Sequence, residues 1–326
     1  MNICVTGCCG FIGFHLSKLL IKKKINIFGL DTINNYYDIN IKKNRLRILN
    51  KYKNFNFKKI DISNYRKLDN FIKNKKIDIL VNLAAYAGVQ YSLKNPYKYF
   101  NANELGFLNI CEISKKRKIK KVIFASSSSV IGDNKKIPFA ENDRTDKPIS
   151  LYGATKKNNE ILAYYYSKFF NINFVGLRFF TVYGPYGRPD LSIYKFCDRI
   201  LKKKEIILNN FGNHYRDFTY IDDVVHSIWK IIKLKKINKE SKLNKNFNIF
   251  NLGGGKSIKI TYLVKLIEKY TNTKAKIKFG PFLKGDIHTS KANTTKIKKY
   301  INYVPKTRIE KGLKEFIFWF RSYYKI

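Results

Sequence analysis

Acidic residues are scarce in this chain: 23 Asp and Glu stand against 65 Lys and Arg among 326 residues, giving a net charge of +42. Such an excess is one signature of proteins that bind nucleic acids or anionic membranes. However, 54 of the basic residues are Lys and only 11 are Arg, and the lysines are spread over the whole chain. Nucleic-acid surfaces usually use Arg alongside Lys. We therefore interpret the charge as codon bias and expect no specific nucleic-acid partner, with nucleic-acid binding kept as the rival class.

Long apolar runs are missing as well. No stretch approaches the roughly 18 residues that a membrane-spanning helix needs. The first residues, MNICVTG, have neither the basic region nor the apolar region of a secretory signal. The C-terminal KEFIFWFRSYY (314–324) resembles a membrane-surface helix, but packing against the domain is the commoner fate of one short apolar segment. We expect no membrane association.

Cysteine and histidine are few. The five cysteines (Cys4, Cys8, Cys9, Cys111 and Cys197) form an odd, scattered set without metal-ligand spacing, so we expect free thiols and a cytoplasmic location. None of the four histidines has a metal-like partner at suitable spacing. The pair Asp222 and Asp223 follows a predicted strand and is interpreted as capping the next helix. The sequence therefore predicts no metal site.

The chain does contain a regular alternation of short apolar runs with amphipathic segments. The runs occupy residues 2–7, 25–30, 54–61, 77–85, 120–128 and 173–180. Near-continuous apolar strands separated by helices indicate an α/β fold: a Rossmann-type, doubly wound parallel sheet covered on both faces. We expect a cofactor domain over residues 1–180, returning near 217–253. The expected smaller, discontinuous C-terminal substrate-binding domain uses residues 181–216 and 254–326.

A glycine-rich loop follows the first predicted strand. VTGCCGFIGFHL (5–16) carries Gly7, Gly10 and Gly13 and opens a helix. Glycines allow a tight turn and a close phosphate approach, while the helix N-terminus offers N–H groups. The next strand ends at Asp31, whose carboxylate suits the adenosine ribose hydroxyls and would repel a 2′-phosphate. This pattern predicts a dinucleotide site that prefers NAD to NADP, with Asp61 and Ile62 near the adenine.

A tyrosine and a lysine, Tyr152 and Lys156, stand four residues apart in SLYGATKK (150–157). At this spacing both side chains lie on one helix face. Tyrosine is a poor base at neutral pH, but a nearby ammonium favours the phenolate. Ser127 and Ser129 end a predicted strand about twenty residues earlier and are suited to orient the same hydroxyl. The pattern indicates proton removal from an alcohol while the cofactor takes hydride.

Together these motifs resemble the extended short-chain dehydrogenase/reductase superfamily, and within it the NAD-dependent nucleotide-sugar epimerases. The similarity is closest to UDP-glucuronate 4-epimerases. The stretches that carry it cover about two-thirds of the chain, in order and without large gaps. They are GLDTINNYYDINIKKNRL (29–46), LAAYAGVQYSLKNP (83–96), SSSSVIG (126–132), SLYGATKKNNE (150–160), LRFFTVYGPYGRPD (177–190) and RDFTYIDDVV (216–225).

The resemblance implies a bound NAD and roles for particular residues. Ser127, Tyr152 and Lys156 match the catalytic triad. Arg216 and Asp286 match contacts of the UDP moiety, and the helices near 100–116 and 152–170 match a homodimer interface. The implied NAD contacts are Gly7, Gly10, Phe11, Ile12, Gly13, Asp31, Asp61, Ile62, Leu83, Ala84, Ala85, Asn103, Ser126, Tyr152, Lys156 and Phe179.

The substrate is expected to carry a carboxylate, as UDP-glucuronate does. Arg188 in GPYGRPD is the candidate partner because a guanidinium meets a carboxylate through two charge-assisted hydrogen bonds. Thr181, Ser128 and Ser129 add neutral donors. Related dehydratases and decarboxylases carry acidic residues where Ser128 and Ser129 stand, so simple epimerisation is favoured.

UDP-glucose 4-epimerase remains the alternative, because its triad is the same. The sequence also departs from the family pattern at three places. Gln90 stands near the expected sugar pocket where Arg is common, Ile131 replaces a usual Tyr, and Cys8-Cys9 replace small residues of the glycine loop.

Overall fold

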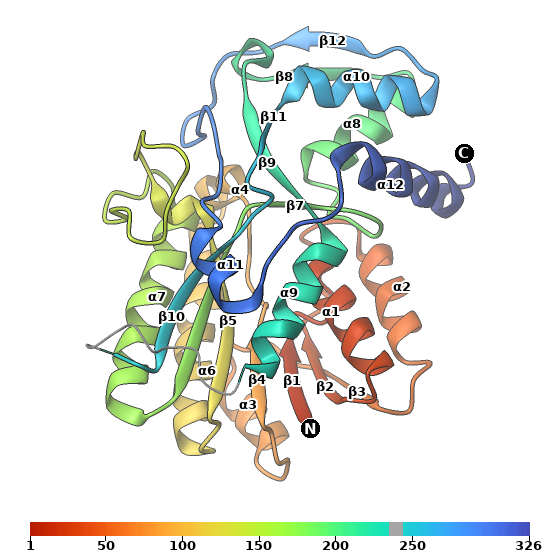
Figure 1. Ribbon diagram of the computed structural model, residues 1–326. Coiled ribbons are helices and arrows are strands. Elements are labelled where there is room, and N and C mark those ends of the chain that lie inside the picture. Colours follow the sequence, from red (N-terminus) through yellow and green to blue (C-terminus); the bar gives the residue numbers. More distant parts are fainter. Residues whose placement is uncertain (235–243) are drawn as a thin grey trace.

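A parallel sheet of seven strands forms the centre of the computed structural model, which describes residues 1–234 and 244–326 (Figure 1). Its strand order is β10-β6-β5-β4-β1-β2-β3. The strands are β1 (Asn2–Thr6), β2 (Asn26–Asp31), β3 (Phe55–Lys59), β4 (Ile79–Asn82), β5 (Lys121–Ser127), β6 (Asn173–Phe179) and β10 (Phe247–Leu252). The order reverses direction between β1 and β4, as in doubly wound sheets. The predicted fold class is confirmed.

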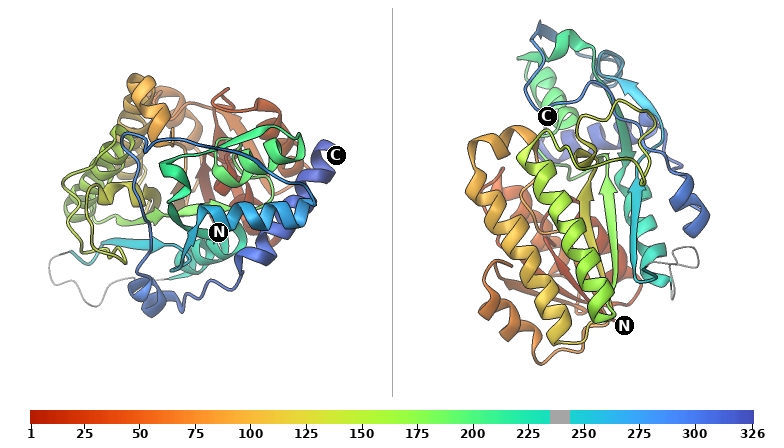
Figure 2. Two further views of the ribbon diagram at one scale, coloured as in Figure 1. Left: turned by 90° about the horizontal axis from the view of Figure 1, so that it is seen from above. Right: turned by 90° about the vertical axis from the view of Figure 1, so that its left-hand side faces the viewer.

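Helices cover both faces of this sheet, because its strands are apolar on both sides (Figure 2). One layer contains α1 (Phe11–Lys22), α2 (Ile39–Leu49) and α9 (Ile221–Lys233), with α1 packed between the other two. The other layer contains α3 (Tyr65–Ile72), α6 (Gly106–Lys116) and α7 (Leu151–Phe170). Each layer buries its own apolar cluster against the sheet.

Between β4 and α6 the chain forms α4 (Val89–Lys94), α5 (Pro96–Tyr99) and a π-helical segment η1 (Phe100–Leu105). A 3-10 turn, η2 (Ser128–Ile131), directly follows β5. Both segments lie at the end of the sheet where the parallel strands finish.

Smaller elements lie beyond the carboxyl ends of the sheet strands (Figure 1). The strands β7 (Thr181–Tyr183), β9 (Tyr215–Tyr220) and β11 (Ser257–Lys259) form a three-stranded sheet. The strands β8 (Glu205–Leu208) and β12 (Lys276–Phe279) pair in parallel, and η3 (Asn210–Gly212) is a short 3-10 turn. The helices of this part are α8 (Ser192–Leu201), α10 (Ile260–Thr271) and α12 (Ile309–Tyr324), whereas α11 (Thr295–Ile301) packs against β10 and α9. The expected return of the chain to the large sheet is β10, while β9 belongs to the small sheet.

The C-terminal apolar segment forms most of α12 and packs against the protein through Leu313, Phe316 and Phe320. Among the described helices, none is long and apolar enough to cross a membrane. All five cysteines are buried free thiols.

The prediction that Asp222 and Asp223 cap α9 is wrong in its detail. The N-cap is Tyr220, and both aspartates lie in the first turn, where carboxylates favour the positive end of the helix dipole. Asp223 has a second role, because its Oδ2 accepts a hydrogen bond from Thr307 N at 3.0 Å. It thereby ties the segment before α12 to α9.

Candidate active site

One cavity of about 430 Å³ opens at the carboxyl ends of the sheet strands, between the sheet and the smaller C-terminal elements. This is where open α/β sheets bind their ligands. It gathers most of the residues singled out in the sequence. Those that line it are Gly7, Gly10, Phe11, Ile12, Gly13, Asp31, Asp61, Ile62, Leu83, Ala84, Ala85, Ser126, Ser127, Ser128, Ser129, Tyr152, Lys156, Phe179, Thr181, Arg188, Arg216 and Asp286.

The glycine loop between β1 and α1 has a shape that only glycine permits. Gly7 has a φ of +69°, and a Cβ there would lie 2.7 Å from Ala84 N. A Cβ on Gly13 would lie 2.1 Å from the Gly7 carbonyl oxygen. The N-cap of α1, Gly10, has no side chain to occupy the first N–H groups of the helix. The loop therefore leaves an open helix N-terminus at the cavity, which fits the diphosphate of a dinucleotide.

Asp31 ends β2 beside this loop and fastens it. Its Oδ2 accepts from Cys9 N at 3.0 Å and its Oδ1 from Ile33 N at 2.8 Å. Each carboxylate oxygen retains capacity for a further donor, as binding of two ribose hydroxyls requires. A 2′-phosphate would meet the Asp31 charge directly, which agrees with the predicted preference for NAD.

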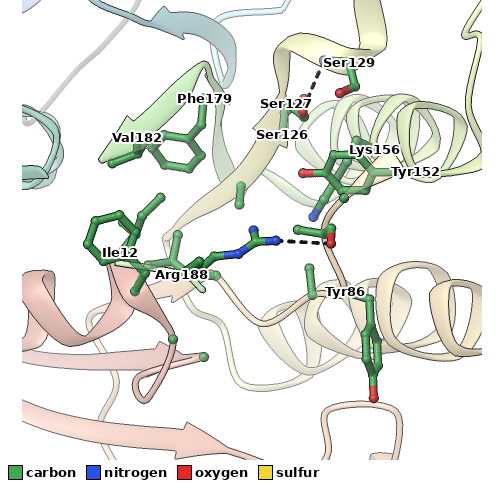
Figure 3. Close-up of a pocket in the computed structure, with 18 of the residues that line it drawn as sticks. Ile12, Tyr86, Ser126, Ser127, Ser129, Tyr152, Lys156, Phe179, Val182 and Arg188 are labelled. Atoms are coloured by element: carbon green, nitrogen blue, oxygen red, sulfur yellow. Dashed lines mark hydrogen bonds between the residues drawn. The ribbon is translucent and has the colours of Figure 1, made fainter. Parts of the chain in front are cut away.

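The candidate triad comes from two neighbouring elements. Ser127 is the last residue of β5, and Tyr152 and Lys156 lie one turn apart on α7 (Figure 3). The helix starts where it does because the Ser150 hydroxyl accepts from Gly153 N at 3.0 Å. The Tyr99 ring packs edge-on against the Tyr152 ring, with the two ring centroids 6.1 Å apart. Ser127 Oγ also accepts from Ser129 N at 3.1 Å, which fixes the hydroxyl at the strand end.

In the protein alone, burial has the largest influence on the pKa values of Tyr152 and Lys156. It raises the pKa of Tyr152, against the opposing effects of the Ser127 hydroxyl and the Arg188 charge. Burial also lowers the pKa of Lys156 to about 8, against the attraction of Glu104. The net pKa of Tyr152 therefore lies above its usual value, opposite to the net lowering expected from the sequence, because burial outweighs the groups that favour the phenolate. Both side chains lose hydration in this pocket, which disfavours the phenolate of Tyr152 and the ammonium of Lys156.

Arg188 lines the cavity, and its guanidinium points toward Tyr152 and Lys156 (Figure 3). It already has an acidic partner, because Nε is 3.0 Å from Asp190 Oδ1 and Nη2 is 2.5 Å from Asp190 Oδ2. Nη2 also donates to the Ala87 carbonyl at 3.3 Å. Burial disfavours the charged guanidinium, but the ion pair with Asp190 more than compensates and raises the pKa of Arg188.

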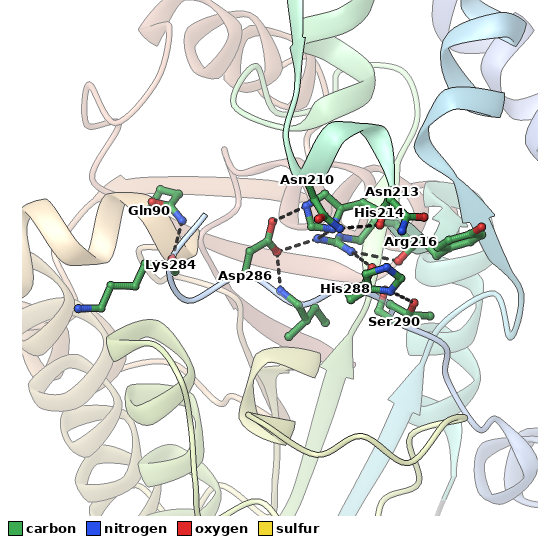
Figure 4. A network of polar contacts seen from close by, with 12 residues as sticks. Gln90, Asn210, Asn213, His214, Arg216, Lys284, Asp286, His288 and Ser290 are labelled. Atoms are coloured by element: carbon green, nitrogen blue, oxygen red, sulfur yellow. Dashed lines mark hydrogen bonds and ion pairs between the residues drawn. The ribbon is translucent and has the colours of Figure 1, made fainter. Parts of the chain in front are cut away.

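A second arginine that lines the cavity, Arg216 on β9, belongs to a polar network (Figure 4). Its Nη2 is 2.7 Å from Asp286 Oδ1 and 3.3 Å from His214 Nδ1, and its Nη1 donates to the His288 carbonyl at 3.0 Å. Burial lowers the pKa of Arg216, while Asp286 opposes the shift. This arrangement holds a guanidinium ready for an anionic group at the cavity rim.

Two predicted site residues do not line the cavity. Asn103 is buried in η1, where its amide bonds the backbone of Tyr86 at 2.9 and 3.0 Å and Thr155 Oγ1 at 3.1 Å. These hydrogen bonds fix the loop after β4 against α7. Gln90 is exposed on α4, and its Nε2 donates to the Lys284 carbonyl at 3.0 Å. This hydrogen bond links α4 to the segment that carries Asp286.

Sequence reasoning missed several cavity residues, among them Tyr36 and Tyr86 on loops and Lys42 on α2. Lys42 is almost fully buried, and its Nζ donates to the Asn34 backbone carbonyl at 2.9 Å. The available signal was that Tyr36 and Lys42 fall within the family-like stretch 29–46 and Tyr86 within the stretch 83–96. No group of three metal-binding side chains occurs in the described ranges 1–234 and 244–326.

Comparisons with known proteins agree with this geometry. A Methanocaldococcus jannaschii protein described as uncharacterized protein MJ1055 is 50% identical over 98% of this chain and 96% of its own length. The UDP-glucuronate 4-epimerase of Thermodesulfobacterium geofontis is 39% identical over 97% of this chain and 94% of its own. The crystal structure of UDP-glucuronic acid 4-epimerase from Bacillus cereus with UDP-glucuronic acid and NAD superposes with a TM-score of 0.91, at 30% identity, over 99% and 100% of the two chains.

The family model described as NAD dependent epimerase/dehydratase family matches residues 3–253, which include the glycine loop, Asp31 and the triad. Together with the geometry of the cavity, this match shows that the chain belongs to the NAD-dependent epimerase/dehydratase family.

Proposed function

We propose that this protein epimerises UDP-glucuronate at C4 to UDP-galacturonate. The observation that carries the proposal is the meeting of Ser127, Tyr152 and Lys156 with the glycine loop in one cavity. The relatives and structural neighbours named UDP-glucuronate 4-epimerase support the choice of substrate. Two arginines, Arg188 and Arg216, line the cavity, which suits a substrate that carries a diphosphate and a carboxylate.

The triad residues have separate tasks in this reaction. The glycine loop and Asp31 would hold NAD, which would supply the hydride chemistry at C4. The Tyr152 phenolate takes the proton of the 4-hydroxyl and returns it after the 4-keto sugar has turned. The Ser127 hydroxyl donates to the substrate oxygen and orients it. Lys156, protonated, favours the phenolate state of Tyr152.

The substrate carboxylate adds a second requirement, because the site must not promote decarboxylation. With C4 oxidised, glucuronate is a β-keto acid that loses CO₂ unless the site avoids promoting that loss. Arg188 and the hydroxyls of Ser128, Ser129 and Thr181 hold the carboxylate in this proposal. None of these residues is an acid that would assist expulsion of water or CO₂.

Incubation of the purified protein with UDP-glucuronate tests the proposal. NMR of the sugar H4 coupling should show conversion to the galacto configuration, and Arg188→Ala run alongside should lose much of it. The alternative function is that of a UDP-glucose 4-epimerase, and the Asp190 partner of Arg188 favours it, because the pair is neutral as a whole. Turnover of UDP-glucose without turnover of UDP-glucuronate would establish that alternative.

A further inference from the structure

The ion pair between Arg188 and Asp190 occupies one complete edge of the guanidinium. Nε and Nη2 meet the two carboxylate oxygens at 3.0 and 2.5 Å, so this edge is satisfied side-on. Nη1 donates no hydrogen bond to any residue in the described part of the chain. A ligand carboxylate therefore meets Arg188 at Nη1, or takes the place of Asp190.

Tyr36 holds Asp190 in this arrangement from a third loop. Its hydroxyl donates to Asp190 Oδ2 at 3.2 Å, and Arg188 Nη2 lies 3.4 Å from the same hydroxyl. The Tyr36 hydroxyl also donates to the Ala87 carbonyl, so its single proton is shared between the two acceptors. The pair is thus fixed by segments that follow β2, β4 and β7, and not by the short stretch 188–190 alone.

The charge of the pair matters for any anion that binds beside it. The Arg188 and Asp190 side chains are 19% and 30% exposed, so water screens them only in part. An incoming carboxylate is attracted by Arg188 and repelled by Asp190, whereas a neutral hydroxymethyl group is nearly indifferent to both.

We propose that Asp190 sets the selectivity of the cavity between uronate and neutral UDP-sugars by competing with the substrate carboxylate for Arg188. This inference rests on the proposed function in taking Arg188 as the residue that faces the sugar carboxylate. Asp190 acts through Arg188 and is a specificity residue without a step in the chemistry. The arrangement explains how one site admits a carboxylate without binding it so strongly that the 4-keto sugar cannot turn.

The test compares equilibrium binding of UDP-glucuronate and UDP-glucose to the NAD-loaded wild type and to Asp190→Asn, by titration calorimetry. Removing the negative charge should raise the preference for UDP-glucuronate over UDP-glucose by about tenfold. This factor corresponds to a pKa shift of about one unit, the lower end of the range that a charge within about 4–6 Å produces in an ionised neighbour. Asp190→Ser should change the preference in the same direction. Asp190→Glu keeps the charge and should leave the preference near that of the wild type.

A preference that stays constant or falls in both neutral variants overturns the inference, since Asp190 would then only orient Arg188. Thermal unfolding and bound NAD content identify a variant that has lost its fold, and Asp190→Ser then serves as the neutral variant. Wild-type turnover of UDP-glucuronate is measured separately. Its absence would refute the proposed function, while the binding ratios would still decide the role of Asp190.

Discussion

At the scale of single residues, Tyr152 is the group on which the chemistry depends. Replacing it by Phe keeps the ring beside Tyr99 but removes the proton acceptor. We expect turnover of UDP-glucuronate to fall by about 10²–10⁴-fold, the usual contribution of a general base. Bound NAD and the melting temperature should stay close to those of the wild type. The matched control is Tyr262→Phe on α10, an exposed tyrosine away from the cavity, which should retain full turnover.

The pH dependence of kcat/KM follows from the two buried groups of the triad. Burial raises the pKa of Tyr152, so the phenolate becomes more populated as the pH rises. Burial lowers the pKa of Lys156 to about 8, so its supporting charge is lost above that pH. We expect kcat/KM to increase up to a pH near 8 and then to flatten or fall. A profile that is highest under acidic conditions would contradict both assignments.

At the scale of elements, a buried ion pair close to the triad ties α7, β5 and β6 together. Arg178 on β6 meets Glu160 on α7 at 2.8 and 2.9 Å, and Ser126 on β5 donates to the same carboxylate at 2.6 Å. The two charged side chains are only 3% and 4% exposed. This network fixes the strand end that carries Ser127 relative to the helix that carries Tyr152 and Lys156.

Breaking this network should cost stability. Glu160→Gln leaves the Arg178 guanidinium buried without a carboxylate, and we expect unfolding in urea to become easier by about 3–5 kcal/mol. The control is Arg144→Gln, which removes an exposed ion pair with Asp146 and should give no resolvable change. Equal urea midpoints for Glu160→Gln and the wild type would show that water or a rearranged side chain satisfies Arg178.

At the scale of the whole molecule, the outward faces of α6 and α7 expose several large apolar side chains. They are Leu108, Ile161, Tyr164, Tyr165, Phe169 and Phe170. Monomeric proteins rarely leave such a group uncovered, which supports the homodimer proposed from the family resemblance.

Light scattering should give the mass of a dimer for the wild type, and Ile161→Glu should shift the protein toward the monomer because a charge would be buried at the interface. A matched control is Phe318→Glu, an exposed apolar position on α12, which should leave the mass unchanged. A wild type that is monomeric at micromolar concentration would contradict the proposal.

Much of the fold and site could be predicted because the relevant signals are local. The alternation of apolar runs with amphipathic segments determines a parallel sheet with helices on both faces, and the spacing of Gly7, Gly10 and Gly13 determines a loop that only glycine can form. The spacing of Tyr152 and Lys156 places both on one face of α7 through helix geometry alone.

Only the tertiary structure decided which partners those residues have. The pairing of Arg188 with Asp190 and Tyr36, the place of Asn103 behind the loop after β4, and the position of Gln90 outside the cavity depend on segments far apart in the chain. The raised pKa of Tyr152 depends in the same way on burial, which the spacing to Lys156 does not report. Local backbone geometry follows from neighbouring residues, whereas hydration and charge pairing depend on what the completed fold brings alongside.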